Sequence, residues 1–213
     1  MIKSRVKNDD LLIDGPRDAA TIVVLAHGAG APMDSPFMNT VAAGLAREGT
    51  GVVRFEFPYM HSRRTSGKRR PPDREPVLIE AWREVIERLG GGARLVIGGK
   101  SMGGRIASMV TDEIGVRGLV CLGYPFHPVG KPDKLRVEHL RAIETPTLIL
   151  QGERDPFGGR EEVAKYKVSP SVRVEWLNDG DHSFKPRKTS GTTEEQNWKA
   201  AIDAIGSFLE SLR

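Results

Sequence analysis

The sequence predicts a doubly wound α/β fold, in which a mainly parallel sheet of about six or seven strands is flanked by helices. Short apolar runs alternate with segments whose apolar residues recur at helical spacing. The runs are mostly continuous, which is typical of strands buried on both faces of a sheet. We expect strands at residues 22–26, 52–57, 95–98, 119–123, 147–151 and 172–177.

Capping residues and apolar stripes indicate the longer helices. Ser35 and Pro36 can cap and start the first of them. A second is expected from about residue 73 to 89, before three consecutive glycines. The last helix begins near Thr192, which with Glu195 resembles a capping box. Its expected buried stripe consists of Trp198, Ile202, Ile205, Phe208, Leu209 and Leu212.

Length and composition favour one globular domain that spans residues 1–213. A hydrophobic content of 38% and a charged content of 28% are ordinary for a globular protein. No apolar run approaches the roughly 20 residues that span a bilayer, and no signal core follows the first residues. The single cysteine, Cys121, cannot form an internal disulfide and reads as a core thiol. We therefore expect a cytoplasmic protein.

The most informative motif is a Gly-x-Ser-x-Gly at residues 99–103, between an expected strand and a helix-patterned stretch. This is the setting of a nucleophile elbow, whose sharp turn requires small residues on both sides of the serine. Ser101 is therefore the candidate nucleophile. Two nucleotide motifs fail nearby: the phosphate-binding loop would need glycine at Arg94, and a dinucleotide fingerprint at 28–33 would need glycine at Met33. We expect no cofactor and no metal.

A serine nucleophile needs a histidine base and a carboxylate that orients the histidine. Asp155 follows the expected strand 147–151, and His182 follows the strand 172–177. Because parallel strands end at one edge of the sheet, these loops can meet Ser101 there. The order Ser, Asp, His is that of a known hydrolase arrangement. The rival acids are Glu153, Asp179 and Asp181, which we interpret as turn residues or solvated charges.

An oxyanion hole would complete the site with two backbone N–H groups. The residue after the nucleophile, Met102, supplies one donor, and Ala29 in the loop after strand 22–26 supplies the other. We expect His27 to order this loop by hydrogen bonding, without a part in proton transfer.

The basic segment 61–74 has two interpretations. It is either a solvated loop whose arginines pair with carboxylates, or a clamp in which Arg69 and Arg70 hold an anionic substrate. His127 follows strand 119–123 and is a candidate for lining the pocket. We interpret His61 and His139 as ordinary loop or surface residues.

The chain resembles the α/β-hydrolase superfamily, and within it the small dienelactone-hydrolase-like group related to the Tex30 and KANL3 proteins. The resemblance covers nearly the whole chain. Residues 27–36, 57–60, 98–105 and 180–184 carry it. It implies a hydrolase fold with the triad positions filled, but no particular substrate. Dienelactone hydrolase uses a cysteine nucleophile, where this chain has Ser101, and KANL3-type relatives act in chromatin complexes.

These observations predict a carboxylesterase-like serine hydrolase that cleaves a small ester through an acyl-enzyme. Peptidases, thioesterases and acyltransferases would use the same parts. Because little sequence separates strands 119–123 and 147–151, we expect no large lid and an open site. The alternative is a binding or scaffold protein with little turnover and a protein partner. Nucleic acid is disfavoured as a partner, because the net charge is only +4 and the basic run lacks interleaved aromatic residues. A membrane is disfavoured because no apolar run is long enough to span one.

Overall fold

The computed structural model describes residues 10–16 and 18–213, and a seven-stranded sheet runs through them. The strand order is β1-β3-β2-β4-β5-β6-β7, and every neighbouring pair is parallel except β1 with β3. The strands are β1 (Leu12–Asp14), β2 (Ile22–Ala26), β3 (Gly51–Phe55), β4 (Leu95–Lys100), β5 (Gly118–Leu122), β6 (Thr147–Gly152) and β7 (Val172–Leu177). The predicted doubly wound, mainly parallel fold is confirmed.

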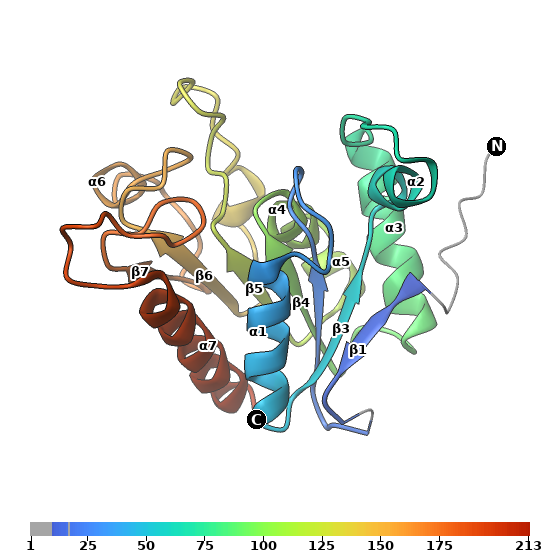
Figure 1. The fold of residues 1–213 in the computed structure, drawn as a ribbon. Helices are drawn as coiled ribbons and strands as arrows, with labels where there is room; N and C mark the ends of the chain where they lie inside the picture. Colours follow the sequence, from blue (N-terminus) through green and yellow to red (C-terminus); the bar gives the residue numbers. More distant parts are fainter. Residues whose placement is uncertain (1–9, 17) are drawn as a thin grey trace.

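Helices cover both faces of this sheet (Figure 1). They are α1 (Pro36–Arg47), α2 (Pro58–Ser66), α3 (Glu75–Arg88), α4 (Met102–Ser108), α5 (Thr111–Ile114), α6 (Arg160–Val163) and α7 (Glu194–Ser211). Two buried apolar clusters show the layers. One joins α1 and α7 to one face of the sheet, and the other joins α3 and α4 to the opposite face. The central strands are buried on both faces, which is why their sequences are continuously apolar.

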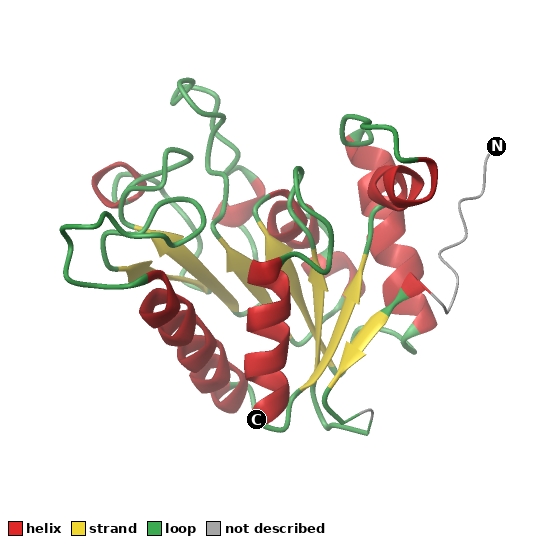
Figure 2. Cartoon of the chain, in the orientation of Figure 1, coloured by secondary structure: helices red, strands yellow, loops and turns green. Residues whose placement is uncertain are grey.

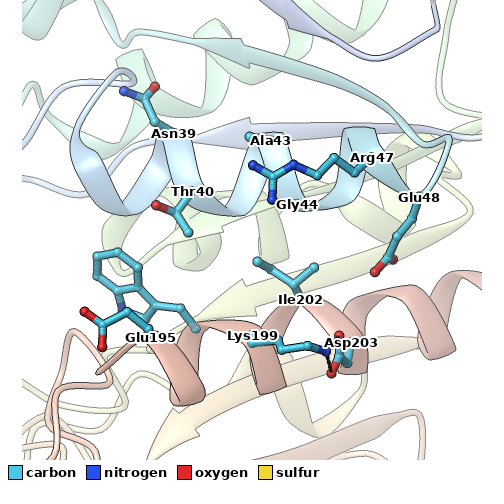
Figure 3. A pocket seen from close by; sticks show the side chains of 11 residues that line it. Asn39, Thr40, Ala43, Gly44, Arg47, Glu48, Glu195, Lys199, Ile202 and Asp203 are labelled. Carbon is cyan, nitrogen blue, oxygen red and sulfur yellow. Dashed lines mark hydrogen bonds and ion pairs between the residues drawn. The ribbon is translucent and has the colours of Figure 1, made fainter. Parts of the chain in front are cut away.

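Helices α1 and α7 pack closely where a glycine meets a branched side chain. A Cβ on Gly44 would stand only 2.5 Å from Cδ1 of Ile202, and Figure 3 shows the Ile202 side chain directed from α7 toward α1. Buried residues of α7 include Ile205, Phe208 and Leu209, as its apolar stripe predicted. The small residue in α1 thus lets the last helix seat against the sheet.

Three local expectations need correction. The capping box of α7 is formed by Thr193 and Gln196, one residue later than the pair Thr192 and Glu195. The first part of the segment expected as a basic loop, residues 61–66, belongs to helix α2. This helix begins at Pro58, and a proline at the first position favours helix initiation. Strand β1 was not predicted, because three residues at an antiparallel edge give too short a pattern.

Loops that follow the parallel strands gather along one edge of the sheet, the upper edge in Figure 2. Within residues 123–146, which connect β5 to β6, the only helical element is a 3₁₀ turn, η2 (His139–Arg141). The expected absence of a large helical lid is therefore confirmed for this connection. None of the helices in the described ranges is long and apolar enough to cross a membrane.

Trp82 anchors α3 to the sheet, and its indole is completely buried against Phe55, with ring centroids 4.7 Å apart. We predict that Trp82→Ala lowers the free energy of unfolding by about 3–5 kcal/mol, because a large cavity remains. Chemical denaturation measures this loss. The matched control is Val77→Ala on the exposed side of α3, which should change the free energy by less than about 0.5 kcal/mol. Equal losses in both variants would contradict the assignment of the anchor.

Candidate active site

Ser101 lies in the sharp turn between β4 and α4. Its backbone has φ 51° and ψ −114°, a region that residues with a Cβ rarely occupy. Strain of this kind persists only where the surrounding structure holds it in place. The turn lifts the serine hydroxyl to the edge of the sheet where the loops gather.

The glycines on either side of Ser101 permit this turn. A Cβ on Gly99 would stand 2.1 Å from the carbonyl oxygen of Ala26, the last residue of β2, and a Cβ on Gly103 would stand 2.5 Å from the same oxygen. Neither contact is sterically tolerable for a side chain. The expectation that small residues flank the serine is therefore confirmed.

The structure brings the three predicted residues into one hydrogen-bonded chain. The Ser101 hydroxyl lies 2.8 Å from Nε2 of His182, and Nδ1 of His182 lies 2.7 Å from Oδ2 of Asp155. An ionised carboxylate can only accept hydrogen bonds, so Nδ1–H is the donor to Asp155. Nε2 is then free to accept the hydrogen bond from Ser101. This arrangement can draw a proton from the serine hydroxyl.

The Asp155 carboxylate is completely buried and fixed by further hydrogen bonds. The backbone N–H of Phe157 donates to Oδ1 at 2.9 Å, and the side-chain amide of Gln151 donates to Oδ2 at 2.9 Å. Gln151 also accepts a hydrogen bond from the Tyr124 N–H at 2.7 Å. No sequence motif marks Gln151, although a glutamine at the end of an apolar strand is a signal of a buried polar contact.

The rival acids have other partners. Glu153 accepts from the Asp179 N–H and pairs with Arg160. Asp181 accepts from the backbone of its own turn. Hydrogen bonding from Arg187 holds the pKa of Asp179 down at about 2. They serve as turn and ion-pair residues, as expected.

Helix α7 holds the loop that carries His182. The buried side chain of Asn197 donates to the carbonyl oxygens of Asn178 and Phe184 at 3.0 and 2.8 Å. The indole N–H of Trp198 donates to the carbonyl of Ser183 at 3.1 Å. The first turns of α7 thereby fix the loop on both sides of the histidine.

His27 and Tyr59 order the loop after β2. Nδ1 of His27 donates to the Gly28 carbonyl at 2.7 Å, which leaves Nε2 to accept from the Phe57 N–H at 3.1 Å. The Tyr59 hydroxyl donates to the Ala29 carbonyl at 2.9 Å. Burial lowers the pKa of His27, so the neutral form that makes these two bonds is favoured.

The two predicted oxyanion donors, Ala29 and Met102, are free to bind an oxyanion. In the part of the chain that the structure describes, the backbone N–H groups of Ala29 and Met102 donate to no other group of the protein. The Met102 amide is the first of α4, and such N-terminal amides have no partner inside a helix. Both residues line a cavity that also contains Ser101.

Two cavities meet at Ser101. One has a volume of about 540 Å³ and aromatic walls formed by Phe37, Phe157 and Trp198. The other, of about 300 Å³, is more polar and includes Arg105 and Arg136. A further groove of about 570 Å³ lies between α1 and α7 (Figure 3), but Ser101, Asp155 and His182 do not line it. The volume of a cavity alone therefore does not identify the candidate active site.

The other candidate residues lie outside these two cavities. Arg69 and Arg70 are exposed in the segment between α2 and α3, and Arg70 donates to the Ser62 hydroxyl at 3.2 Å. The end of that segment, at Pro72 and Asp73, does line the smaller cavity. His127 is buried, with Nε2 at 3.1 Å from Oε1 of Glu162.

A second serine–histidine pair differs from the first in its hydrogen bonding. The Ser108 hydroxyl lies 2.8 Å from Nε2 of His139, but it donates its proton to the Arg105 carbonyl at 2.6 Å. His139 therefore donates to Ser108 rather than accepting from it. In addition, no group of three or more potential metal ligands occurs among the residues that the structure describes.

Comparisons with known proteins agree on the fold. Three solved structures show the same architecture at low sequence identity. Dienelactone hydrolase from Anabaena variabilis is 20% identical, with a TM-score of 0.72 over 94% of this chain and 90% of that chain. Est1E from Butyrivibrio proteoclasticus, solved with ferulic acid, is 14% identical, with a TM-score of 0.68 over 94% and 95%. XC6422 from Xanthomonas campestris, a serine hydrolase without a lid, is 17% identical, with a TM-score of 0.63 over 95% and 87%.

The family comparison extends over nearly the whole chain. The sequence profile of the alpha/beta hydrolase domain matches residues 19–210, from just before β2 to the last turn of α7. This span contains the Ser101 turn and the loops that carry Asp155 and His182. The chain therefore belongs to the alpha/beta hydrolase family.

Proposed function

We propose that this protein is a serine hydrolase that cleaves small esters through an acyl-enzyme. Ser101 is the nucleophile, His182 the general base and Asp155 the residue that orients the base. The observation that carries the proposal is the hydrogen-bonded chain from Ser101 through His182 to Asp155, at 2.8 and 2.7 Å. Such a chain activates a hydroxyl that is otherwise a weak nucleophile at neutral pH.

The reaction proceeds in two halves. His182 takes the Ser101 proton as Oγ bonds to the ester carbonyl carbon, and the Ala29 and Met102 amides stabilise the resulting oxyanion. Collapse of this intermediate breaks the bond to the leaving oxygen, which receives the proton from His182. Water then gives a proton to His182 and attacks the acyl carbon. A second collapse breaks the bond between the acyl carbon and Oγ, which receives the proton from His182, and releases the acid.

The shape of the site supports a small ester as substrate. The larger cavity has aromatic walls at Phe37, Phe157 and Trp198, and such walls suit an apolar or aromatic acyl group. The structure of Est1E with ferulic acid provides a family-level parallel. We also propose a cytoplasmic location, the default for a chain whose single cysteine forms no internal disulfide.

We predict that a fluorophosphonate probe labels the wild-type protein and that Ser101→Ala and His182→Ala abolish labelling. The first variant lacks the oxygen that forms the covalent bond, and the second lacks the base. Ser108→Ala is the matched control, because it removes the hydroxyl of the other serine–histidine pair and should label like the wild type. Gel fluorescence after a short exposure measures the labelling of the wild type and the three variants. A folded wild-type protein that resists labelling would favour the binding or scaffold role.

We also propose Arg69 and Arg70 as a clamp for anionic esters, since they lie on the segment whose end borders the smaller cavity. The Arg69→Ala/Arg70→Ala variant should raise KM for an anionic ester about 2–10-fold, the range expected for exposed charges. KM for a neutral ester of the same size should stay constant. Arg94→Ala, at the opposite end of β4, is the control for overall charge. A similar rise for both esters would argue against the clamp.

A further inference from the structure

Lys100, the residue between Gly99 and Ser101, holds a buried cation that the reaction described above does not use. Its Nζ is sealed from solvent and has no hydrogen-bond partner among the described residues. It lies 5.8 Å from the centroid of the Phe37 ring, within the range of a cation–π contact. A surface lysine would instead keep its ammonium group in water.

The ammonium lies behind His182, close to the nitrogen that faces Asp155. A Cβ built on Gly123 would stand 3.0 Å from the Lys100 Nζ and 3.3 Å from His182 Nδ1, so both nitrogens border the same small space. The carboxylates that act on Lys100 are those of Asp155 after β6 and Asp181 after β7. The Phe37 ring, on α1, contacts the Lys100 ammonium. Glu194, at the start of α7, lines the same cavity as Lys100.

Folding stability does not account for a charge at this position. Burial lowers the pKa of Lys100 to about 8, so the side chain is mostly protonated at neutral pH. A lysine whose pKa is lower in the folded than in the unfolded state destabilises the fold while it is protonated. That cost is present below about pH 8 and fades as the pH rises toward the ordinary value for lysine. An apolar side chain of similar length would avoid it.

We propose that Lys100 is a positioning residue whose buried charge acts on the Asp155–His182 pair and supports transfer of the Ser101 proton to His182 toward lower pH. This inference rests on the proposed function. A positive charge disfavours the imidazolium form of a nearby imidazole and favours the ionised form of a nearby carboxylic acid. Lys100 exchanges no proton with the substrate; it acts through the electrostatic potential at His182.

The test compares pH profiles of kcat/KM for a neutral ester in the wild type and in Lys100→Met. The acid limb of the variant should move to higher pH by about one unit, which is the size of shift that one nearby charge produces. At pH 6 the activity then falls about 5–10-fold, and at pH 8.5 it stays within about twofold of the wild type. The Tm of the variant at pH 7 should rise by about 3 °C or more.

Control variants separate this role from packing. Lys100→Arg keeps the charge, so its acid limb should coincide with that of the wild type. Lys185→Met removes an exposed charge three residues after His182 and should not shift the acid limb. If Lys100→Met does not fold, Lys100→Gln makes the same comparison. An acid limb that coincides in wild type and neutral variants overturns the proposal for Lys100, even where the wild type reacts with the fluorophosphonate. Absence of that reaction in folded wild type overturns the proposed function itself.

Discussion

The close approach of the Gly99–Gly103 turn to the end of β2 is the constraint on which the rest of the site depends. The Ala26 carbonyl occupies the space that a Cβ on either glycine would need, so β2 and β4 can remain in register while the chain turns sharply at the end of β4. Ser101 is thereby forced into its positive φ. The parallel order of β4, β5, β6 and β7 then delivers the following loops to the same edge.

Buried neutral polar side chains support that edge. Gln151 fixes Asp155, His27 fixes the loop after β2, and Asn197 fixes the loop around His182. Each has hydrogen-bond partners in the protein, so its burial leaves no unsatisfied group behind. Lys100 is different because its ammonium is buried without such a partner. Gln151, His27 and Asn197 therefore stabilise the loops of the site, whereas the fold does not require the charge of Lys100.

The sequence predicted the sheet and the meeting of three distant loops because both follow from strong local signals. Six strands have mostly apolar sequences, and Ser101 stands in a turn that only small neighbours allow. The same signals could not reveal β1, which is three residues long, or the partners of Gln151, which come from separate segments. The ambiguity of the basic segment has a similar origin: Arg64 in α2 pairs with Asp34 and Glu56, contacts that only the folded chain creates.

The attachment of the His182 loop to α7 links the geometry of the candidate active site to the folded state of this helix. Helix α7 comprises 18 residues, and a single helix can detach in a partial unfolding event that costs less free energy than global unfolding. Once Asn197 and Trp198 leave their carbonyl partners, the loop loses the contacts that set the histidine opposite Ser101. The strands up to β6 could still retain their parallel pairing. The proposed hydrolytic activity thus depends on local order in α7, and it would be lost at a lower temperature than the signal of the central sheet.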